Sequence, residues 1–199
     1  MEDIESDDIF FDIGANTGLY TLFVSKLCQS GTVVAFEPYP PNIALLKRDI
    51  SRNGADNVEV REVALTNTEG TISFNQPEQP DIGYGSASVD PSDSNQTIEV
   101  PTTSGDQLVA DGEVPQPNVV KIDFEGSEPI VIEGMSDTLS SEECRLVFCE
   151  VHLSNVKHRP SIEDFGSTMA DLQAQLEACG FTVERNRTRG SEVLLKARK

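Results

Sequence analysis

Basic residues are scarce in this sequence. Its 199 residues include 15 lysines and arginines against 34 aspartates and glutamates, which gives a formal net charge of −19 at pH 7. Because such a surface repels phosphate groups, the sequence disfavours nucleic acids and anionic membranes as partners. The acidic residues are spread along the chain and are not gathered in a tail. We therefore interpret the excess as a halophile-like surface that keeps the protein soluble at high salt.

Cysteine motifs, export signals and long apolar runs are also missing. The four cysteines show no C-x-x-C spacing and lie in apolar stretches, at Cys28, Cys144, Cys149 and Cys179. This pattern is typical of reduced core residues in a cytoplasmic protein, and not of a zinc site or a disulfide framework. No secretory signal and no apolar run of about 18 residues is present, and Met1–Asp8 is too short and acidic to be a targeting segment. We expect a cytoplasmic protein with a single domain over residues 1–199, no amino-terminal lid domain and no membrane partner, of undetermined oligomeric state.

A glycine loop follows the first apolar segment, but it lacks the residues that define two common nucleotide loops. No Gly-Lys-Ser/Thr follows it, which excludes a Walker A loop, and Asn16 stands where the middle glycine of G-x-G-x-x-G would be. The apolar run before Gly14 and the apolar-periodic segment after Gly18 predict a strand, a sharp turn and a helix start, whose N–H groups attract hydrogen-bond acceptors. A second predicted strand, 32–36, ends at Glu37, where a carboxylate can accept both hydroxyls of a ribose. Together they indicate a nucleoside site; the plainer alternative is a βαβ turn with a solvated glutamate.

Alternating strand and helix patterns along the chain predict a parallel sheet. Strands are expected at 9–13, 32–36, 58–65, 119–124 and 145–151, followed by an antiparallel hairpin at 181–184 and 192–197. Helices are expected at 17–28, 40–53, 106–109, 127–134 and 161–178. The segment 71–74 is expected to pair with the strand before it through a turn at 66–70. Residues 75–95 are polar and without periodicity, which predicts a long loop that either gates a substrate or is merely mobile, before an extended segment at 97–100.

Two of these helices carry more specific expectations. The helix at 17–28 is expected to pack on the sheet through its apolar side chains, Leu19, Tyr20, Leu22, Phe23, Val24 and Leu27. The helix at 161–178 is expected to be continuous, starting from Ser161 with Asp164 three residues on and stopping at Gly180.

Five short strings of the sequence together resemble one known family. They are FDIGANTG, VVAFEPYPPNIALLKRDI, VREVALTN, VVKIDFEGSE and LVFCEVH, in this order between Ile9 and about His152. The chain resembles the FkbM-type S-adenosylmethionine-dependent methyltransferases. The resemblance implies an α/β, Rossmann-like class I methyltransferase fold, with a mostly parallel seven-stranded sheet and an antiparallel C-terminal hairpin.

The resemblance also implies which residues hold S-adenosylmethionine. They are Asp12, Gly14, Asn16, Gly18, Glu37, Pro38, Asn57, Glu62, Ala64 and Asp123. The glycine loop would cradle the methionine and ribose portions, Glu37 would bind the ribose hydroxyls, and Asp12 would order the loop or the cofactor amino group. Asp123 would lie against the transferable methyl group. The residues around Asn57 and those from Glu62 to Ala64 would border the adenine, although Asn57 is equally suited to cap a turn.

Methyl transfer from a sulfonium to oxygen is an in-line displacement that requires a group to take up the hydroxyl proton. Ligands collect outside the carboxyl ends of strands in such sheets, and four base candidates lie there: Asp123, Glu125, Glu150 and His152. We favour His152, because its unperturbed pKa of about 6.5 suits proton uptake near neutral pH. A divalent cation on the same side chains is an alternative that we do not favour, since spacing alone does not distinguish metal ligands from bases. Lys121, in a buried strand, needs Asp12 or Asp123 as a partner and is expected to be structural.

These patterns lead to one hypothesis and two rivals. The hypothesis is an S-adenosylmethionine-dependent O-methyltransferase that acts on a small-molecule hydroxyl acceptor; the resemblance alone implies a sugar, glycolipid or secondary metabolite. The first rival is a nucleotide-dependent oxidoreductase on the same fold, which the missing middle glycine disfavours. The second is a cofactor-binding module without turnover.

Overall fold

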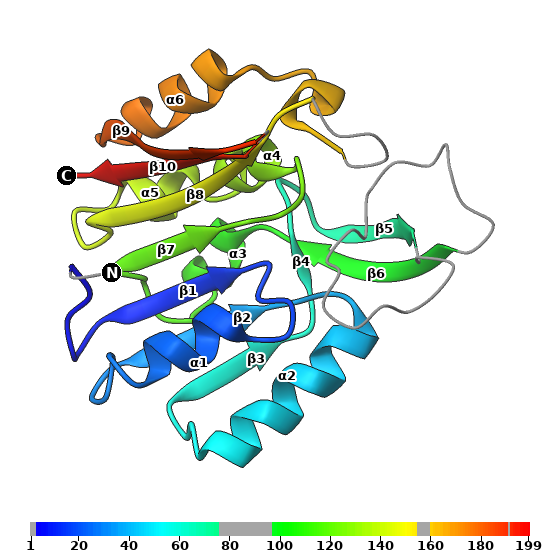
Figure 1. Cartoon of the computed structure of the whole chain (residues 1–199), viewed down its shortest axis with the longest axis vertical. Helices are drawn as coiled ribbons and strands as arrows, with labels where there is room; N and C mark the ends of the chain where they lie inside the picture. Colours follow the sequence, from blue (N-terminus) through cyan, green and yellow to red (C-terminus); the bar gives the residue numbers. More distant parts are fainter. Residues whose placement is uncertain (1–2, 76–96, 155–159, 191) are drawn as a thin grey trace.

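The computed structural model describes residues 3–75, 97–154, 160–190 and 192–199, which form two sheets with helices on both sides of the larger one (Figure 1). The larger sheet has seven strands in the order β3-β2-β1-β7-β8-β10-β9. Their bounds, in that order, are Val58–Arg61, Thr32–Phe36, Ile9–Ile13, Val119–Ile122, Leu146–His152, Glu192–Arg198 and Thr182–Arg189. Strands β3 to β8 in this order run parallel, and β10 is antiparallel to both β8 and β9. The predicted α/β fold, with its mostly parallel sheet and closing hairpin, is confirmed.

A second, three-stranded sheet extends beyond the larger one (Figure 1). Its strands are β4 (Ala64–Leu65), β6 (Thr97–Thr103) and β5 (Gly70–Asn75), in that spatial order. Two expectations are therefore wrong. The single strand expected at 58–65 is divided between the two sheets, and β5 does not pair with the strand before it. The partner of β5 is β6, which lies between β5 and β4. The predicted loop 75–95 lies outside the described residues, except for its first residue, which ends β5.

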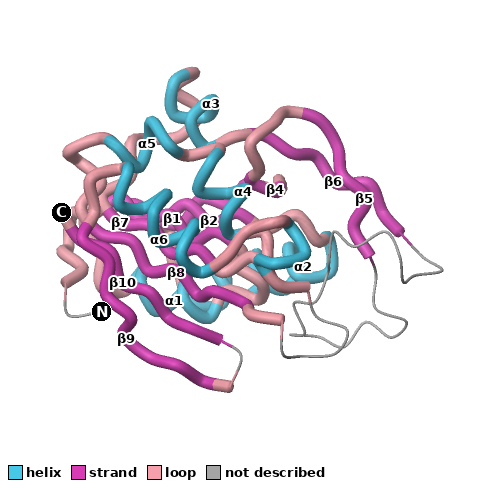
Figure 2. Tube along the Cα trace, turned by 90° about the horizontal axis from the view of Figure 1, so that it is seen from above, coloured by secondary structure: helices cyan, strands magenta, loops and turns pink. Residues whose placement is uncertain are grey.

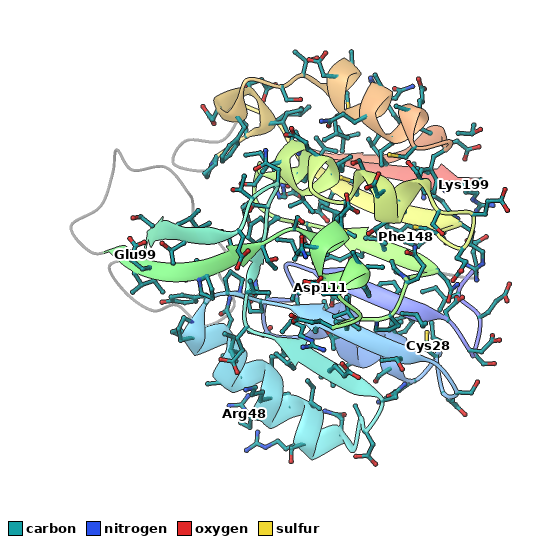
Figure 3. The ribbon with its side chains drawn as sticks, turned by 180° about the vertical axis from the view of Figure 1, so that it is seen from behind. Cys28, Arg48, Glu99, Asp111, Phe148 and Lys199 are labelled. Atoms are coloured by element: carbon teal, nitrogen blue, oxygen red, sulfur yellow. The ribbon has the colours of Figure 1, made fainter. Side chains whose placement is uncertain are left out.

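Helices cover both faces of the larger sheet (Figure 2). Helices α1 (Leu19–Ser25) and α2 (Pro40–Asn53) lie on one face. The other face is covered by α3 (Gly105–Ala110), α4 (Glu128–Glu133), α5 (Ser136–Ser140) and α6 (Met169–Ala178). Figure 3 shows this second face from behind, with Asp111 directly after α3 and Lys199 at the end of the chain. Within the described ranges, no helix has the length and apolar character needed to cross a membrane.

The continuous helix expected at 161–178 is interrupted. A short 3-10 helix, η1 (Ile162–Phe165), carries the expected reciprocal cap between Ser161 and Asp164. It ends at Gly166 in the left-handed region, and α6 starts anew with Thr168 as its cap. The capping signal was therefore recognised correctly, but it belongs to one turn because glycine readily takes the left-handed conformation that ends a helix.

Helix α1 packs on the sheet through a different side from most of the one expected. Of the six apolar residues expected to face the sheet, Val24 is fully buried, whereas Leu19 and Phe23 are 76% and 51% exposed. The small residues Thr21 and Ser25 are buried beside Val24, and the Thr21 hydroxyl donates a hydrogen bond to Asp12 Oδ2 at 2.6 Å. Small side chains at this helical spacing let α1 approach β1 closely, so the side with Thr21, Val24 and Ser25 faces the sheet.

A buried ion pair joins the two central strands. Asp12 of β1 and Lys121 of β7 are neighbours in the strand register, and Lys121 Nζ lies 3.1 Å from Asp12 Oδ1 and 3.4 Å from Asp123 Oδ2. Asp12 is fully buried and Lys121 nearly so. The structural role expected for Lys121 fits this arrangement, because a buried lysine is tolerated when carboxylates neutralise it.

Replacing Lys121 by methionine should lower the free energy of unfolding by about 3 to 5 kcal/mol, since Asp12 would remain buried without its cation. The matched control is Lys47→Met, which removes an exposed lysine paired with Glu62 and should cost less than about 1 kcal/mol. Urea unfolding of both variants measures the difference. Equal losses would show that the central pair contributes no more than a surface pair.

The same leucine-to-alanine change should have unequal effects on the two helices of one face. Leu46 in α2 is fully buried, so Leu46→Ala should cost about 2 to 5 kcal/mol. Leu19 in α1 is mostly exposed, so Leu19→Ala should change stability by less than about 0.5 kcal/mol. Thermal and urea unfolding give both values, and a large loss in Leu19→Ala would mean that this side of α1 is covered in solution.

Candidate active site

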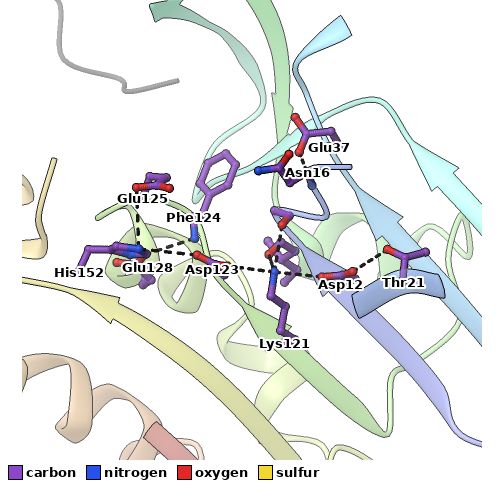
Figure 4. Close-up of polar contacts among 12 residues, drawn as sticks. Asp12, Asn16, Thr21, Glu37, Lys121, Asp123, Phe124, Glu125, Glu128 and His152 are labelled. Carbon is purple, nitrogen blue, oxygen red and sulfur yellow. Dashed lines mark hydrogen bonds and ion pairs between the residues drawn. The ribbon is translucent and has the colours of Figure 1, made fainter. Parts of the chain in front are cut away.

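Three of the four predicted catalytic residues and part of the predicted cofactor set meet at one edge of the larger sheet (Figure 4). The fourth, Glu150, offers a ligand atom within 4.8 Å of those of Asp123 and His152. This edge is formed by the carboxyl ends of β1, β2, β7 and β8. The residues that meet there are Asp12, Gly14, Asn16, Glu37, Asp123, Glu125, Glu150 and His152. The topological rule that ligands gather outside the carboxyl ends of parallel strands therefore places them in one region.

The glycine loop is fastened to the end of β2. The N–H groups of Gly14 and Ala15 donate to the Phe36 carbonyl at 3.1 and 3.0 Å. Glu37 is 4% exposed; its Oε2 accepts the Asn16 N–H at 2.8 Å, and its Oε1 accepts the Tyr39 N–H at 2.9 Å. Burial raises the pKa of Glu37, an effect that these N–H donors partly offset.

The turn at the end of β1 requires glycine. Gly14 has a φ of 73°, and a Cβ atom there would lie 1.9 Å from the Asp123 carbonyl oxygen. The backbone after β1 thus touches the backbone after β7. Gly18, at the other end of the loop, donates its N–H to the Ala15 carbonyl at 2.9 Å and forms the N-cap of α1.

Lys121 connects the loop to the charged centre. Its Nζ donates to the Gly14 carbonyl at 3.0 Å and lies 5.4 Å from the centroid of the Tyr20 ring. Burial alone would lower the pKa of Lys121, but Asp12 and Asp123 outweigh it and raise the pKa above its usual range. Lys121 is therefore a permanent cation beside the loop at neutral pH.

His152, at the end of β8, is surrounded by three carboxylates (Figure 4). Its Nδ1 lies 2.8 Å from Glu128 Oε1. Its Nε2 lies 3.8 Å from both Asp123 Oδ1 and Glu125 Oε2. One ring nitrogen thus contacts the interior of the protein, and the other faces the residues that follow β7.

The charge state of His152 differs from the one expected. Burial alone would lower the pKa of His152, but the hydrogen bond and charge of Glu128, aided by Glu125 and Asp123, raise it to about 9. Burial and the neighbouring Asp123 raise the pKa of Glu150. The ordinary pKa on which the choice of His152 as base relied is therefore wrong, because a pKa of about 9 favours the protonated ring at neutral pH.

Three predicted adenine-bordering residues make contacts away from these side chains. Asn57 precedes β3, at the opposite end of the parallel strands, and donates to the Ser25 and Cys28 carbonyls at 3.1 and 2.7 Å. Glu62 is exposed and pairs with Lys47. Ala64 is buried in the small sheet beside Tyr39 and Val100. Asn57 thus has the turn-capping role that was its alternative.

Sequence reasoning missed Glu128 and Thr21. Glu128 begins α4, has a fully buried side chain, and contacts the ring of His152. It is the last residue of the string VVKIDFEGSE, and in so acidic a chain an acid at a helix start resembles an ordinary solvated cap. The signal for Thr21 was its helical spacing with Val24, Ser25 and Cys28, all of which are buried.

The residues at this edge suit a nucleoside with polar substituents. The Oδ1 atom of Asn16 is buried and has no hydrogen-bond partner among the described residues, so a donor from a ligand would satisfy it. Asp123, Glu150 and His152 offer ligand atoms within 4.8 Å of one another. Acidic side chains commonly lie close together in proteins whether or not they bind an ion, so their closeness does not by itself identify a metal centre.

Known proteins share this sequence pattern. The methyltransferase FkbM domain family matches residues 12–183. The hexuronic acid methyltransferase AglP of Haloferax volcanii is 37% identical over 152 residues, covering 76% of this chain and 59% of AglP. The 31-O-demethyl-FK506 methyltransferase FkbM of Streptomyces tacrolimicus is 26% identical over 207 residues, covering 91% of this chain and 75% of that protein.

Solved structures share the fold. The FkbM methyltransferase of Methylobacillus flagellatus superposes with a TM-score of 0.68 at 15% identity, covering 98% of this chain and 44% of that one. The precorrin-6y C5,15-methyltransferase of Geobacter metallireducens gives 0.61 at 15% identity, covering 99% and 82%. The chain thus spans about six tenths of AglP and less than half of the solved FkbM protein. Its fold is that of the class I S-adenosylmethionine methyltransferases, and the chain belongs to the methyltransferase FkbM domain family.

Proposed function

We propose that this protein transfers a methyl group from S-adenosylmethionine to a hydroxyl oxygen of a small molecule. The observation that carries the proposal is the meeting of the glycine loop, Glu37, Asp123 and His152 at one edge of a class I methyltransferase sheet. In this role S-adenosylmethionine supplies the methyl group. The chain's own residues bind it, orient the acceptor and remove the acceptor proton.

The cofactor contacts are proposed from this geometry. The two oxygens of Glu37 accept the backbone N–H groups of Asn16 and Tyr39 and a hydrogen bond from the Asn42 side chain. Because two carboxylate oxygens offer about four acceptor sites, the carboxylate has capacity left for a hydrogen bond from a ribose hydroxyl. Pro38, also buried, follows it and shapes that turn. The Asn16 Oδ1 atom would accept a donor of the cofactor. Asp12 orders the loop through Thr21 and Lys121.

The charge of the edge favours a sulfonium cofactor over a dinucleotide. Two cations, Lys121 and His152, lie at this edge of the sheet. Six carboxylates outnumber them there or directly behind the edge; they are Asp12, Glu37, Asp123, Glu125, Glu128 and Glu150. An excess of negative charge attracts a positively charged sulfonium and repels a pyrophosphate. This argument supports the methyltransferase role over the nucleotide-dependent oxidoreductase.

Proton uptake is proposed for His152 Nε2, with Asp123, Glu125 and Glu150 as the other candidates. The pKa of His152 is raised by the carboxylates around it. It falls when a positive charge is placed beside Asp123, because like charges disfavour the protonated ring. His152 would then lose its proton on formation of the complex and become able to accept one from the acceptor hydroxyl.

The acceptor is proposed to be a sugar, a glycolipid or a secondary metabolite. Support comes from the relatives, of which one is named a hexuronic acid methyltransferase and another a 31-O-demethyl-FK506 methyltransferase. The 37% identity to a Haloferax protein and the net charge of −19 support a halophile-like enzyme, and the same charge disfavours nucleic acid and anionic membranes as partners. The cytoplasmic location that we propose is supported by the four cysteines, which are buried and free. A divalent cation bound by Asp123, Glu150 and His152 is the less favoured way to activate the hydroxyl.

Calorimetric titration in buffer of high salt should show saturable binding of S-adenosylmethionine and none of NAD, with S-adenosylmethionine binding unchanged after chelation. Binding of NAD alone would favour the oxidoreductase. Release of S-adenosylhomocysteine with uronic acids and other hydroxyl acceptors then tests turnover. Cofactor binding without turnover on any acceptor would support the binding module.

Replacing Glu37 by glutamine should weaken S-adenosylmethionine binding by about tenfold or more, because a hydrogen bond from ribose to a charged acceptor is lost. The matched control is Glu177→Gln, an exposed glutamate in α6, which should change affinity by less than about twofold. Calorimetry gives both affinities, and thermal unfolding is measured beside it. A loss of stability with unchanged affinity would restrict Glu37 to fastening the loop.

A further inference from the structure

One fully buried carboxylate contacts three separate parts of the site. Glu128 Oε1 lies 2.8 Å from His152 Nδ1 and accepts hydrogen bonds from the Gly126 N–H at 3.0 Å and the Phe124 N–H at 3.3 Å. The Glu128 side chain is 0% exposed. It therefore joins the start of α4, the backbone after β7 and the end of β8 through a single oxygen atom.

The backbone that Glu128 holds is strained. Glu125 has a φ of 47°, in the left-handed region that side chains other than glycine rarely adopt. Such a conformation persists only where the surrounding structure imposes it. Glu128 binds the N–H groups on both sides of Glu125, and Gly126 (φ 90°) has no space for a Cβ, which would lie 2.8 Å from the Ser161 nitrogen.

The same oxygen decides which way His152 faces. A carboxylate at Nδ1 keeps a proton on that nitrogen, so Nε2 is the nitrogen that can gain or lose a proton. Nε2 faces Asp123 and Glu125 at 3.8 Å. Without Glu128, Nδ1 would lose its carboxylate partner, and the left-handed turn at Glu125 would keep only its backbone bond from the Ser127 N–H to the Phe124 carbonyl among the bonds described around it.

We propose that Glu128 is a positioning residue that fixes the side chains of Glu125 and His152 relative to each other. It holds Glu125 through the backbone N–H groups on either side and His152 through Nδ1 of its ring. This proposal rests on the proposed function only where it assigns proton uptake to His152 Nε2. Glu128 does not touch the reacting atoms: it contacts the far nitrogen of the ring and the peptide N–H groups behind Glu125.

Other charged groups surround the ring and must be considered in any titration. They are Asp123 and Glu125 after β7, Glu150 on the same strand, and Glu192, which stands opposite His152 in the β8–β10 register. Lys121, beyond Asp123, opposes them. Glu128 lies closer to the ring, at a hydrogen-bonding distance of 2.8 Å, than Asp123 and Glu125, which lie at 3.8 Å.

Nuclear magnetic resonance of the unliganded, 15N-histidine-labelled protein in chelator tests the proposal. The sequence has two histidines, so His158 serves as the reference signal. Above its pKa, wild-type His152 should be the Nδ1–H tautomer, which is the less common one in free histidine. An Nε2–H tautomer would overturn the proposal, and this result needs no variant to fold.

Variants then test the charge. Glu128→Gln, which keeps the size of the side chain, should lower the pKa of His152 by about one unit or more from its wild-type value. The control is Glu133→Gln, at the exposed end of the same helix, which should shift it by less than about 0.3 units. An unchanged pKa in Glu128→Gln would overturn the positioning role. Both results are independent of cofactor binding, so they remain informative whether or not the methyltransferase proposal holds.

Discussion

The site depends on the buried ion pairs that Lys121 forms with Asp12 and Asp123. Its Nζ contacts Asp12 of β1, Asp123 after β7 and the Gly14 carbonyl. Removing water from three charges is costly unless they neutralise one another at close range. The consequence is geometric: the strand ends and the glycine loop cannot separate without exposing a charge to the apolar interior. The two halves of the site are therefore held at a fixed distance by an electrostatic requirement.

Local sequence patterns were sufficient to predict the frame of the fold. Apolar runs ending in glycine or acidic residues predicted β1, β2, β7 and β8, and a Pro-Pro start with a Gly54 stop predicted α2. These features depend on residues close together in the chain. The split of 58–65 between two sheets does not, because it is β6, from residues far along the chain, that draws Ala64 and Leu65 away from the larger sheet.

Helix α1 shows why hydrophobicity alone misleads. Both its apolar and its small residues recur at helical spacing, and hydrophobicity favours the apolar set. The sheet selects the small set, because Thr21 satisfies the buried Asp12 carboxylate and its short side chain permits close packing. Asp12 is buried in turn because Lys121 is its register neighbour. The orientation of one helix is thus decided by a charge on a different strand, which no local pattern contains.

The site itself was predictable in its positions but not in its charge states. Strand ends located Asp123, Glu125, Glu150 and His152 at one edge, whereas the pKa of His152 depends on Glu128, a contact that exists only in the folded chain. The position of Asn57 relative to the site could not be read from its place in the sequence. Asn57 directly precedes β3, so it lies at the end of the parallel strands opposite the site, where it donates to the Ser25 and Cys28 carbonyls.

The two loops of the site are held by the same physical device. Asn16 and Glu125 are the residues other than glycine with left-handed backbones in the described part of the chain, and each lies in a loop at this edge. A buried glutamate fixes each one: Glu37 accepts the N–H of Asn16, and Glu128 accepts the N–H groups on either side of Glu125. A charged acceptor forms stronger hydrogen bonds to backbone N–H groups than a neutral one, which offsets the strain of the left-handed turns. Some of the acidic residues of this chain are therefore buried, and the carboxylates of Glu37 and Glu128 fix the backbone of the two loops at the proposed ligand site.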